Sequence, residues 1–226
     1  ELLRHRAIML LNLFHLDDDE AAFLRDRVMQ DGRTVALVGP VGLLGPRGLD
    51  ASRSSAILGW PMRLVDEEMA LQASCSADLA GPWAAAAGAL TGTTQAYRPA
   101  VLPAETGAAK VLATLVGGTQ PAVLWDDTRA GGRVFWSAAP GLRPEALRAL
   151  AESAGVPVVC RSQDAIYAGQ GFIGLHASTA GEKVVTLPRP GAAVDILTGR
   201  RWPEGTREVR LDLQAGETVI LRTTGL

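Results

Sequence analysis

Ser137 is the side chain whose position in the sequence best suits nucleophilic catalysis. It ends the apolar run Arg133–Trp136 and precedes a predicted helix, where a hydroxyl can stand above the edge of a sheet. The chain has no G-x-S-x-G pattern, and neither Cys75 nor Cys160 has the flanking glycines that a strained nucleophile turn requires. No base or orienting group can be assigned to any of the three. The sequence therefore predicts no catalytic residue.

Paired acidic residues could act as general acid and base on a sugar, because glycoside hydrolysis uses two carboxylates about 5–9.5 Å apart. Asp126 and Asp127 form the only such pair at the end of a predicted strand. Neighbouring residues of one strand point to opposite faces, so these two carboxylates would not meet one substrate. The pair is more typical of a turn, and the acidic run Asp17–Glu20 is typical of a helix cap.

Metal and cofactor sites are not expected. His5, His15 and His176 lie far apart in the sequence, and neither cysteine has a partner at the spacing of zinc ligands. Gly39–Gly42 (GPVG) follows a predicted strand, but Pro40 removes a backbone N–H that a phosphate cradle would use. We therefore expect no metal ion and no cofactor.

Aromatic side chains offer a different chemistry, which is stacking against sugar rings. Trp202 lies beside two arginines and Pro203 in a predicted turn, and it is the tryptophan expected to be most exposed. Trp125 and Trp136 lie inside apolar strands and are expected in the core. Tyr167 is a further aromatic candidate. Carbohydrate binding, if this chain performs it, is predicted at Trp202.

Composition excludes several classes of protein. The 226 residues include 22 Lys+Arg and 24 Asp+Glu, with 47% hydrophobic and 20% charged residues. These fractions are ordinary for a folded protein and exclude general disorder. The near-neutral charge and the scattered arginines argue against a nucleic-acid partner, and no apolar run approaches the ~20 residues of a membrane span. Two cysteines make no disulfide framework and leave the compartment open.

The residues near the N-terminus predict a parallel sheet. Ala7–Phe14 is an apolar run of strand length, typical of a strand covered on both faces, and Thr34–Val38 is a second one. The acidic run Asp17–Glu20 between them begins a helix with capping-box spacing. Such a strand–helix–strand unit pairs its strands in parallel. Gly39–Gly48 has glycine at every third position, which we interpret as a loop. No element can be assigned to residues 81–96.

The pattern changes towards the C-terminus. Leu142–Ala154 predicts an amphipathic helix, with proline in its first turn and glycine after its end. From Asp164 onward, short alternating runs separated by Gly or Pro are typical of a small antiparallel β-sandwich. We therefore place a boundary near Ser162, with one domain over residues 1–162 and another over residues 163–226.

Five short segments carry a resemblance to a known family. They are LLNLFHL at 10–16, DGRTV at 31–35, GPVG at 39–42, VFWSAAPGL at 134–142 and VDILTG at 194–199. The first four resemble the amidotransferase-like domain of multidomain β-galactosidases and related glycoside hydrolases, often called the trimerisation domain. The fifth is similar to the small β-domain that closes such proteins.

This resemblance implies an α/β fold. A flavodoxin-like three-layer domain with the core of class I glutamine amidotransferases, but no working cysteine, would be followed by the small β-sandwich. The resemblance also implies that the sugar-cleaving carboxylates lie on a separate (β/α)₈ barrel, N-terminal in the same polypeptide, and that copies of the protein associate. We further expect that residues 1–162 lack the first strand of this domain and that Glu1 is not a natural N-terminus.

Three functions stay open at this point. The first is a non-catalytic accessory or oligomerisation region of a β-galactosidase-like glycoside hydrolase. The second is a freestanding α/β hydrolase-type enzyme with a crevice at the carboxyl ends of its parallel strands. The third is a carbohydrate-binding module that uses Trp202. The crevice of the second function would be lined by His15, Gly39, Gly42, Asp126 and Ser137.

Overall fold

The computed structural model describes residues 1–226 as two compact units, Glu1–Val156 and Pro157–Leu226. The sequence places the boundary near Ser162, a few residues later. In the structure, Val159 and Cys160 already pack against the core of the second unit. No helix of either unit combines the length and the apolar character that a membrane span requires.

The first unit contains ten strands and a few short helices. Its elements, in chain order, are η1 (Leu2–Arg4), β1 (Ala7–His15), α1 (Asp18–Phe23), η2 (Leu24–Val28), β2 (Thr34–Gly45), β3 (Gly48–Leu49), α2 (Ala51–Leu58), β4 (Met62–Val65), β5 (Met69–Cys75), η3 (Gly81–Ala86), β6 (Leu90–Tyr97), β7 (Ala100–Pro103), β8 (Lys110–Leu115), β9 (Pro121–Asp126), β10 (Arg133–Ser137) and α3 (Pro144–Ser153).

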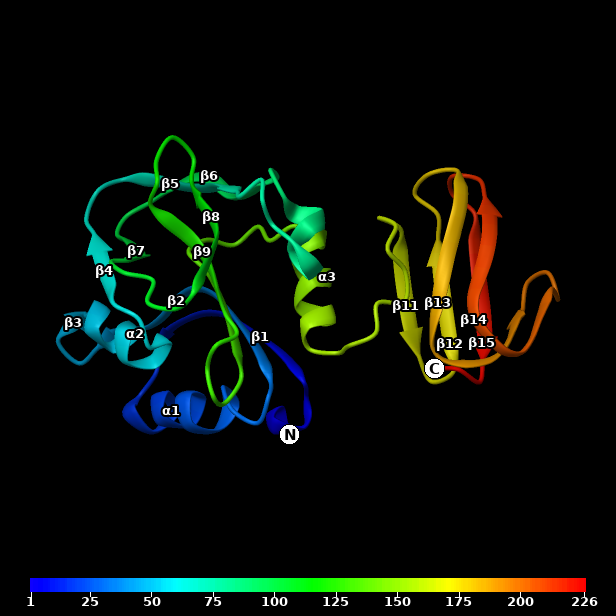
Figure 1. Cartoon of the computed structure of the whole chain (residues 1–226), viewed down its shortest axis with the longest axis horizontal. Helices are drawn as coiled ribbons and strands as arrows, with labels where there is room; N and C mark the ends of the chain where they lie inside the picture. The colour runs from blue at the N-terminus through cyan, green and yellow to red at the C-terminus, as the bar shows by residue number, and fades with distance from the viewer. The chain divides into compact units, whose positions relative to one another are not determined.

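Eight strands of this unit form one curled mixed sheet, in the order β1-β2-β10-β9-β8-β5-β6, with β3 paired to the end of β2 (Figure 1). The predicted parallel pairing of β1 with β2 is confirmed, and β10 is also parallel to β2. The remaining pairs are antiparallel. A two-stranded sheet of β4 and β7 stands apart from this one.

The chain as a whole is mostly β, with 48% of residues in strands and 17% in helices, so a flavodoxin-like three-layer arrangement is not clearly shown. The reason lies in the connections. Short loops at 116–120 and 127–132 join β8 to β9 and β9 to β10 directly. Such loops allow antiparallel neighbours, whereas parallel neighbours need a crossover that is usually helical.

The predicted helix cap at Asp17 is confirmed. Asp17 Oδ1 accepts a hydrogen bond from the Glu20 N–H (2.8 Å), and Glu20 Oε2 accepts one from the Asp17 N–H (2.9 Å). These two bonds satisfy backbone donors that the first turn of α1 would otherwise leave without partners. Asp50 caps α2 in a similar way, because its Oδ1 accepts from the Ser52 N–H (2.9 Å).

The prediction of a loop over Gly39–Gly48 is wrong. β2 continues to Gly45 and then turns back into β3. The register between β1 and β2 shifts twice, because β2 advances three residues where β1 advances two. Gly39 (φ +83°) and Gly42 (φ +58°) lie in these irregular stretches. Regularly spaced glycines therefore mark bulges within a strand, where a positive φ is needed.

The core of the first unit lies on both faces of its central strands, β2, β10 and β9. Trp125 and Trp136 are 5% and 1% exposed, so their predicted burial is confirmed. Trp83, from the segment to which the sequence assigned no element, stacks on Phe135 (ring centroids 5.6 Å apart) and meets Trp125 edge-on (5.2 Å). Such aromatic pairs contribute beyond the area they bury.

The second unit is a five-stranded antiparallel sheet in the order β11-β12-β15-β13-β14. The strands are β11 (Ala165–Gly169), β12 (Phe172–His176), β13 (Gly181–Asp195), β14 (Arg201–Leu213) and β15 (Thr218–Thr223).

The long strand β13 lets this sheet enclose its own core. Its first part pairs with β14, and its last residues also pair with β15. A register shift between Thr186 and Gly191 marks the irregular stretch between these parts. Apolar side chains of β13 and β14 therefore share one buried cluster with Ile173 of β12 and Leu221 of β15.

Candidate functional site

Ser137 ends β10 at the carboxyl end of the parallel strands, where the predicted crevice begins. It is 2% exposed, and its Oγ donates a hydrogen bond to the Ala139 carbonyl oxygen (2.8 Å). A catalytic serine needs a neighbouring base that accepts its proton. This hydroxyl is instead buried and engaged by the backbone.

Gly39 lets Asn12 of β1 approach β2 closely, and Gly42 lets Ile57 of α2 approach it. A Cβ atom at Gly39 would collide with Asn12 Oδ1, and one at Gly42 would lie 2.5 Å from Ile57 Cδ1. Both positions therefore exclude a side chain in order to let neighbouring groups approach. They contribute no group to a reaction.

His15 is not brought together with Ser137. It is exposed at the end of β1, level with Leu44 of β2, whereas Ser137 is level with Val38. The two side chains are thus separated by six residues of β2, which corresponds to roughly 15–20 Å along a strand.

Asp126 lies at the opposite end of the sheet. Because β9 runs antiparallel to β10, Asp126 is level with Val134 rather than with Ser137. Its carboxylate accepts hydrogen bonds from Arg129 Nε (2.6 Å) and from the Thr128 hydroxyl (2.7 Å). Burial opposes ionisation of this carboxyl, but the hydrogen bonds outweigh burial and lower its pKa below the ordinary value. Asp126 is therefore an anion held in a structural ion pair.

Metal ligands do not gather anywhere in the chain, since no three His, Cys, Asp or Glu side chains form a group that could hold an ion. The two cysteines do not pair. Burial raises the pKa of the Cys75 thiol, which makes it less nucleophilic at neutral pH than a free thiol. Cys160 Sγ lies 2.9 Å from Ser162 Oγ in the second unit.

Trp202 is half-buried rather than openly exposed. Its ring packs partly against the core of the second unit, and the Arg200 guanidinium lies 4.8 Å from its ring centroid. A cation in this position occupies the face on which a sugar would stack. The sequence had pointed to this tryptophan, but its ring is already partnered.

The outer edge of β1 is the most unusual surface of the first unit. No strand pairs with β1 on the side away from β2. Its nine residues contain no proline, lysine or arginine, and Met9, Leu11 and Phe14 are 43%, 59% and 47% exposed. A long apolar edge strand presents free N–H and C=O groups, which makes it a template for pairing with another strand.

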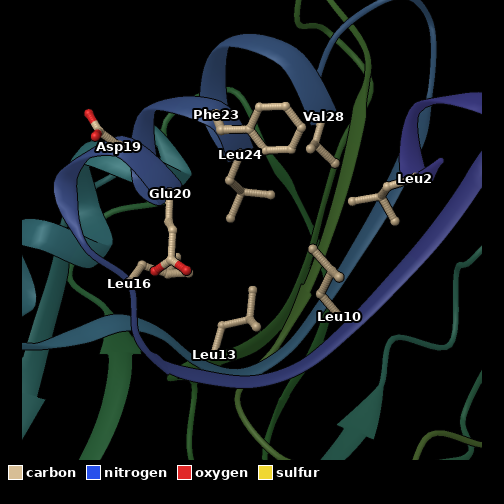
Figure 2. A pocket seen from close by; sticks show the side chains of 9 residues that line it. All are labelled: Leu2, Leu10, Leu13, Leu16, Asp19, Glu20, Phe23, Leu24 and Val28. Carbon is tan, nitrogen blue, oxygen red and sulfur yellow. The ribbon is translucent and has the colours of Figure 1, made fainter.

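A groove of about 420 Å³ lies beside this edge, between β1 and the helical segment of α1 and η2 (Figure 2). The positive φ of Asn12 (+51°) interrupts the alternation of side chains along β1, so that Leu10 and Leu13, three residues apart, face the same groove. The side chains that line it are mostly apolar: Leu2, Leu10, Leu13, Leu16, Asp19, Glu20, Phe23, Leu24 and Val28.

The two carboxylates at the groove do not form a catalytic pair. Glu20 is held by the capping box through the Asp17 N–H. The Asp19 carboxylate points away from the groove (Figure 2). The groove is therefore suited to receive apolar side chains rather than to carry out a reaction.

Known proteins match this chain in fold but not in sequence. No family model matches the chain, and neither does any curated protein. Among solved structures, the chain is similar to the β-galactosidase from Bacillus circulans sp. alkalophilus, with 15% identity and a TM-score of 0.56. The match covers 96% of this chain but only 33% of that one. An exo-β-1,4-mannosidase from Opitutaceae bacterium strain TAV5 has 18% identity, but its TM-score of 0.33 over 64% of this chain and 22% of that one carries no argument.

The chain therefore has a glycoside hydrolase-like fold and spans about a third of the length of the β-galactosidase that it matches. At 15% identity this likeness concerns the fold alone.

Proposed function

We propose that this chain is a non-catalytic, structural region of a larger β-galactosidase-like glycoside hydrolase. In this proposal the first unit is derived from an amidotransferase-like trimerisation domain, and the second is the small β-domain that follows it. The sugar-cleaving barrel is a partner within the same polypeptide, and copies of the whole protein associate.

The uncovered edge of β1, together with its apolar groove, carries this proposal. β1 has no acidic or basic residue other than His15 and exposes three large apolar side chains, so its contact with water is unfavourable. A groove lined by leucines beside it offers a second apolar surface. We infer that one extended segment from the rest of the polypeptide pairs with β1, while an apolar side chain of that segment fills the groove.

The β-galactosidase comparison favours the rest of the polypeptide over a second copy as this occupant, because two thirds of that longer chain lie outside the match. The freestanding-enzyme alternative has less support. Ser137 is buried, Asp126 is ion-paired at the other end of the sheet, and His15 is distant from both.

The mass of the native polypeptide tests the proposal most directly. An antibody raised against the 226-residue chain is expected to detect a polypeptide far heavier than 23.7 kDa in extracts of the source organism. Detection of a polypeptide near 23.7 kDa would overturn the proposal. Turnover lost in a folded Ser137→Ala variant would then favour the crevice enzyme.

Hydrogen exchange tests the occupant separately. The outward amides of β1 are expected to exchange rapidly in the 226-residue chain and slowly in the native polypeptide, because a paired strand protects them. The amides of β6 provide the internal control and should exchange alike in both. Equal exchange of β1 in the two proteins would rule out a covering strand.

A further inference from the structure

The outer face of β11, β12 and β15 carries an aromatic surface in the second unit. Ile173 and Leu175 point into the core, so the alternating residues of β12 face outward. The register aligns Tyr167 of β11, Gly174 of β12 and Ile220 of β15 in one row across this face. Tyr167 is 77% exposed, which is unusual for the large ring of a strand residue.

Gly174 makes this face hollow. A Cβ atom there would lie 3.9 Å from Tyr167 Cβ, so any side chain would fill the space next to the tyrosine. A depression of about 690 Å³ results. Its lining includes Tyr167, Phe172, Gly174, His176, Thr218 and Ile220.

Hydrogen-bonding groups stand at the borders of the depression. His176 Nδ1 lies 2.8 Å from Thr218 Oγ1, which fixes the imidazole beside the hydroxyl. Gln170, in the tight turn between β11 and β12, adds a side-chain amide. No carboxylate, lysine or arginine lines the depression, so the site suits a neutral ligand.

We propose that this depression is a carbohydrate-binding site for one or two neutral pyranose units. A pyranose has an apolar face of C–H groups and a rim of hydroxyls. Its apolar face stacks on the ring of Tyr167, and its hydroxyls exchange hydrogen bonds with His176, Thr218 and Gln170. The inference is independent of the proposed structural role of the first unit.

This placement differs from the one that the sequence suggested. The Trp202 ring is half-buried and faces the Arg200 guanidinium, whereas the Tyr167 ring stands free. The competing occupant is a protein surface packed against the same aromatic side chains, and sugar titrations separate the two.

Titration of the 226-residue chain with lactose, cellobiose, mannobiose and maltose, followed by NMR, tests the site. At least one sugar is expected to bind saturably, with a dissociation constant of about 1 mM, and to shift resonances of β11 and β12. Tyr167→Ala should weaken binding about tenfold or more, since exposed stacking rings dominate such sites. The folded state should persist, because Tyr167 buries little of its surface.

Matched variants make the result decisive. Phe172→Ala and Phe23→Ala remove phenylalanines of similar exposure (42% and 44%), one in the depression and one in the other unit. Only the first should weaken binding, and Trp202→Ala should leave it unchanged. Absence of saturable binding by all four sugars, or binding that depends on Trp202 rather than on Tyr167, would overturn the proposal.

Discussion

The two edges of the eight-stranded sheet are built in opposite ways. At β1 the edge strand is mostly apolar, and Leu11 is 59% exposed. At β6 the edge carries Thr93, Thr94 and Gln95, and a bulge in β6 interrupts its pairing with β5. The Gly92 N–H also donates to the Gly141 carbonyl oxygen (3.4 Å), so another segment covers part of the β6 edge.

This difference indicates which edge is complete. Polar residues, a bulge and a covering segment are the means by which proteins prevent edge strands from pairing with other chains. β6 has all three, whereas β1 has register shifts but no covering segment, and most of its exposed side chains are apolar. The β6 edge of the sheet is thus protected against pairing with another strand, and the β1 edge is not. This difference is the basis for placing an assembly contact at β1.

Gly92→Ala is expected to have the largest effect on stability, because it disrupts the pairing of β6 with β5 at the protected edge. Gly92 has φ +82°, and a Cβ atom there would collide with the Leu71 carbonyl oxygen of the paired strand, which cannot move as a side chain can. We expect urea denaturation to show a free energy of unfolding lower by about 3 kcal/mol or more.

Gly88→Ala is the matched control for that change. Gly88 also has a positive φ (+69°), but no atom lies within 4 Å of the position of its Cβ. This variant should lose only about 1 kcal/mol, the cost of the backbone conformation. Equal losses in both variants would show that the close approach at Gly92 does not hold the β6 edge.

Leu11→Lys tests the open edge. With β1 uncovered, the 226-residue chain is expected to self-associate reversibly, and a lysine on the edge strand should raise the dissociation constant about tenfold, or about 1.4 kcal/mol. Sedimentation velocity over a concentration series measures this change. Leu197→Lys alters a leucine of the same exposure (59%) in the second unit and should have no effect. A monomeric wild-type chain at all concentrations, or equal effects of both variants, would contradict an adhesive β1 edge.

The sequence predicted local features better than the arrangement of the sheet. The Asp17 cap and the buried tryptophans follow from rules that act over a few residues, and both predictions were confirmed. The spread of glycines over Gly39–Gly48 was misread, because a bulge and a loop both require positive φ and only the pairing with β1 distinguishes them.

The candidate site was harder to predict because it depends on strand direction. Asp126 and Ser137 each end a strand, and they would share an edge of the sheet only if β9 and β10 were parallel. The apolar run Ala7–Phe14 predicts a strand covered on both faces, and this is wrong: Met9, Leu11 and Phe14 are exposed, and no strand pairs with the outer edge of β1. Composition alone could not reveal that β1 is uncovered, because the same apolar residues would also suit a strand with another segment packed against it.

Asp17→Ala is expected to have the smallest effect on stability. It tests the helix that lines the groove beside the unprotected β1 edge. The capping box holds the first turn of α1, which forms the wall facing Leu10 and Leu13 of β1. Loss of the cap should lower the free energy of unfolding by about 1 kcal/mol. Asp19→Ala is the control, because it removes a carboxylate from the same turn without removing a capping bond, and should cost less than Asp17→Ala. If the two variants were equally destabilised, the effect would come from the charge near the helix N-terminus. Faster amide exchange in α1 of Asp17→Ala, but not of Asp19→Ala, would indicate that the cap holds this wall of the groove in place in the absence of a partner.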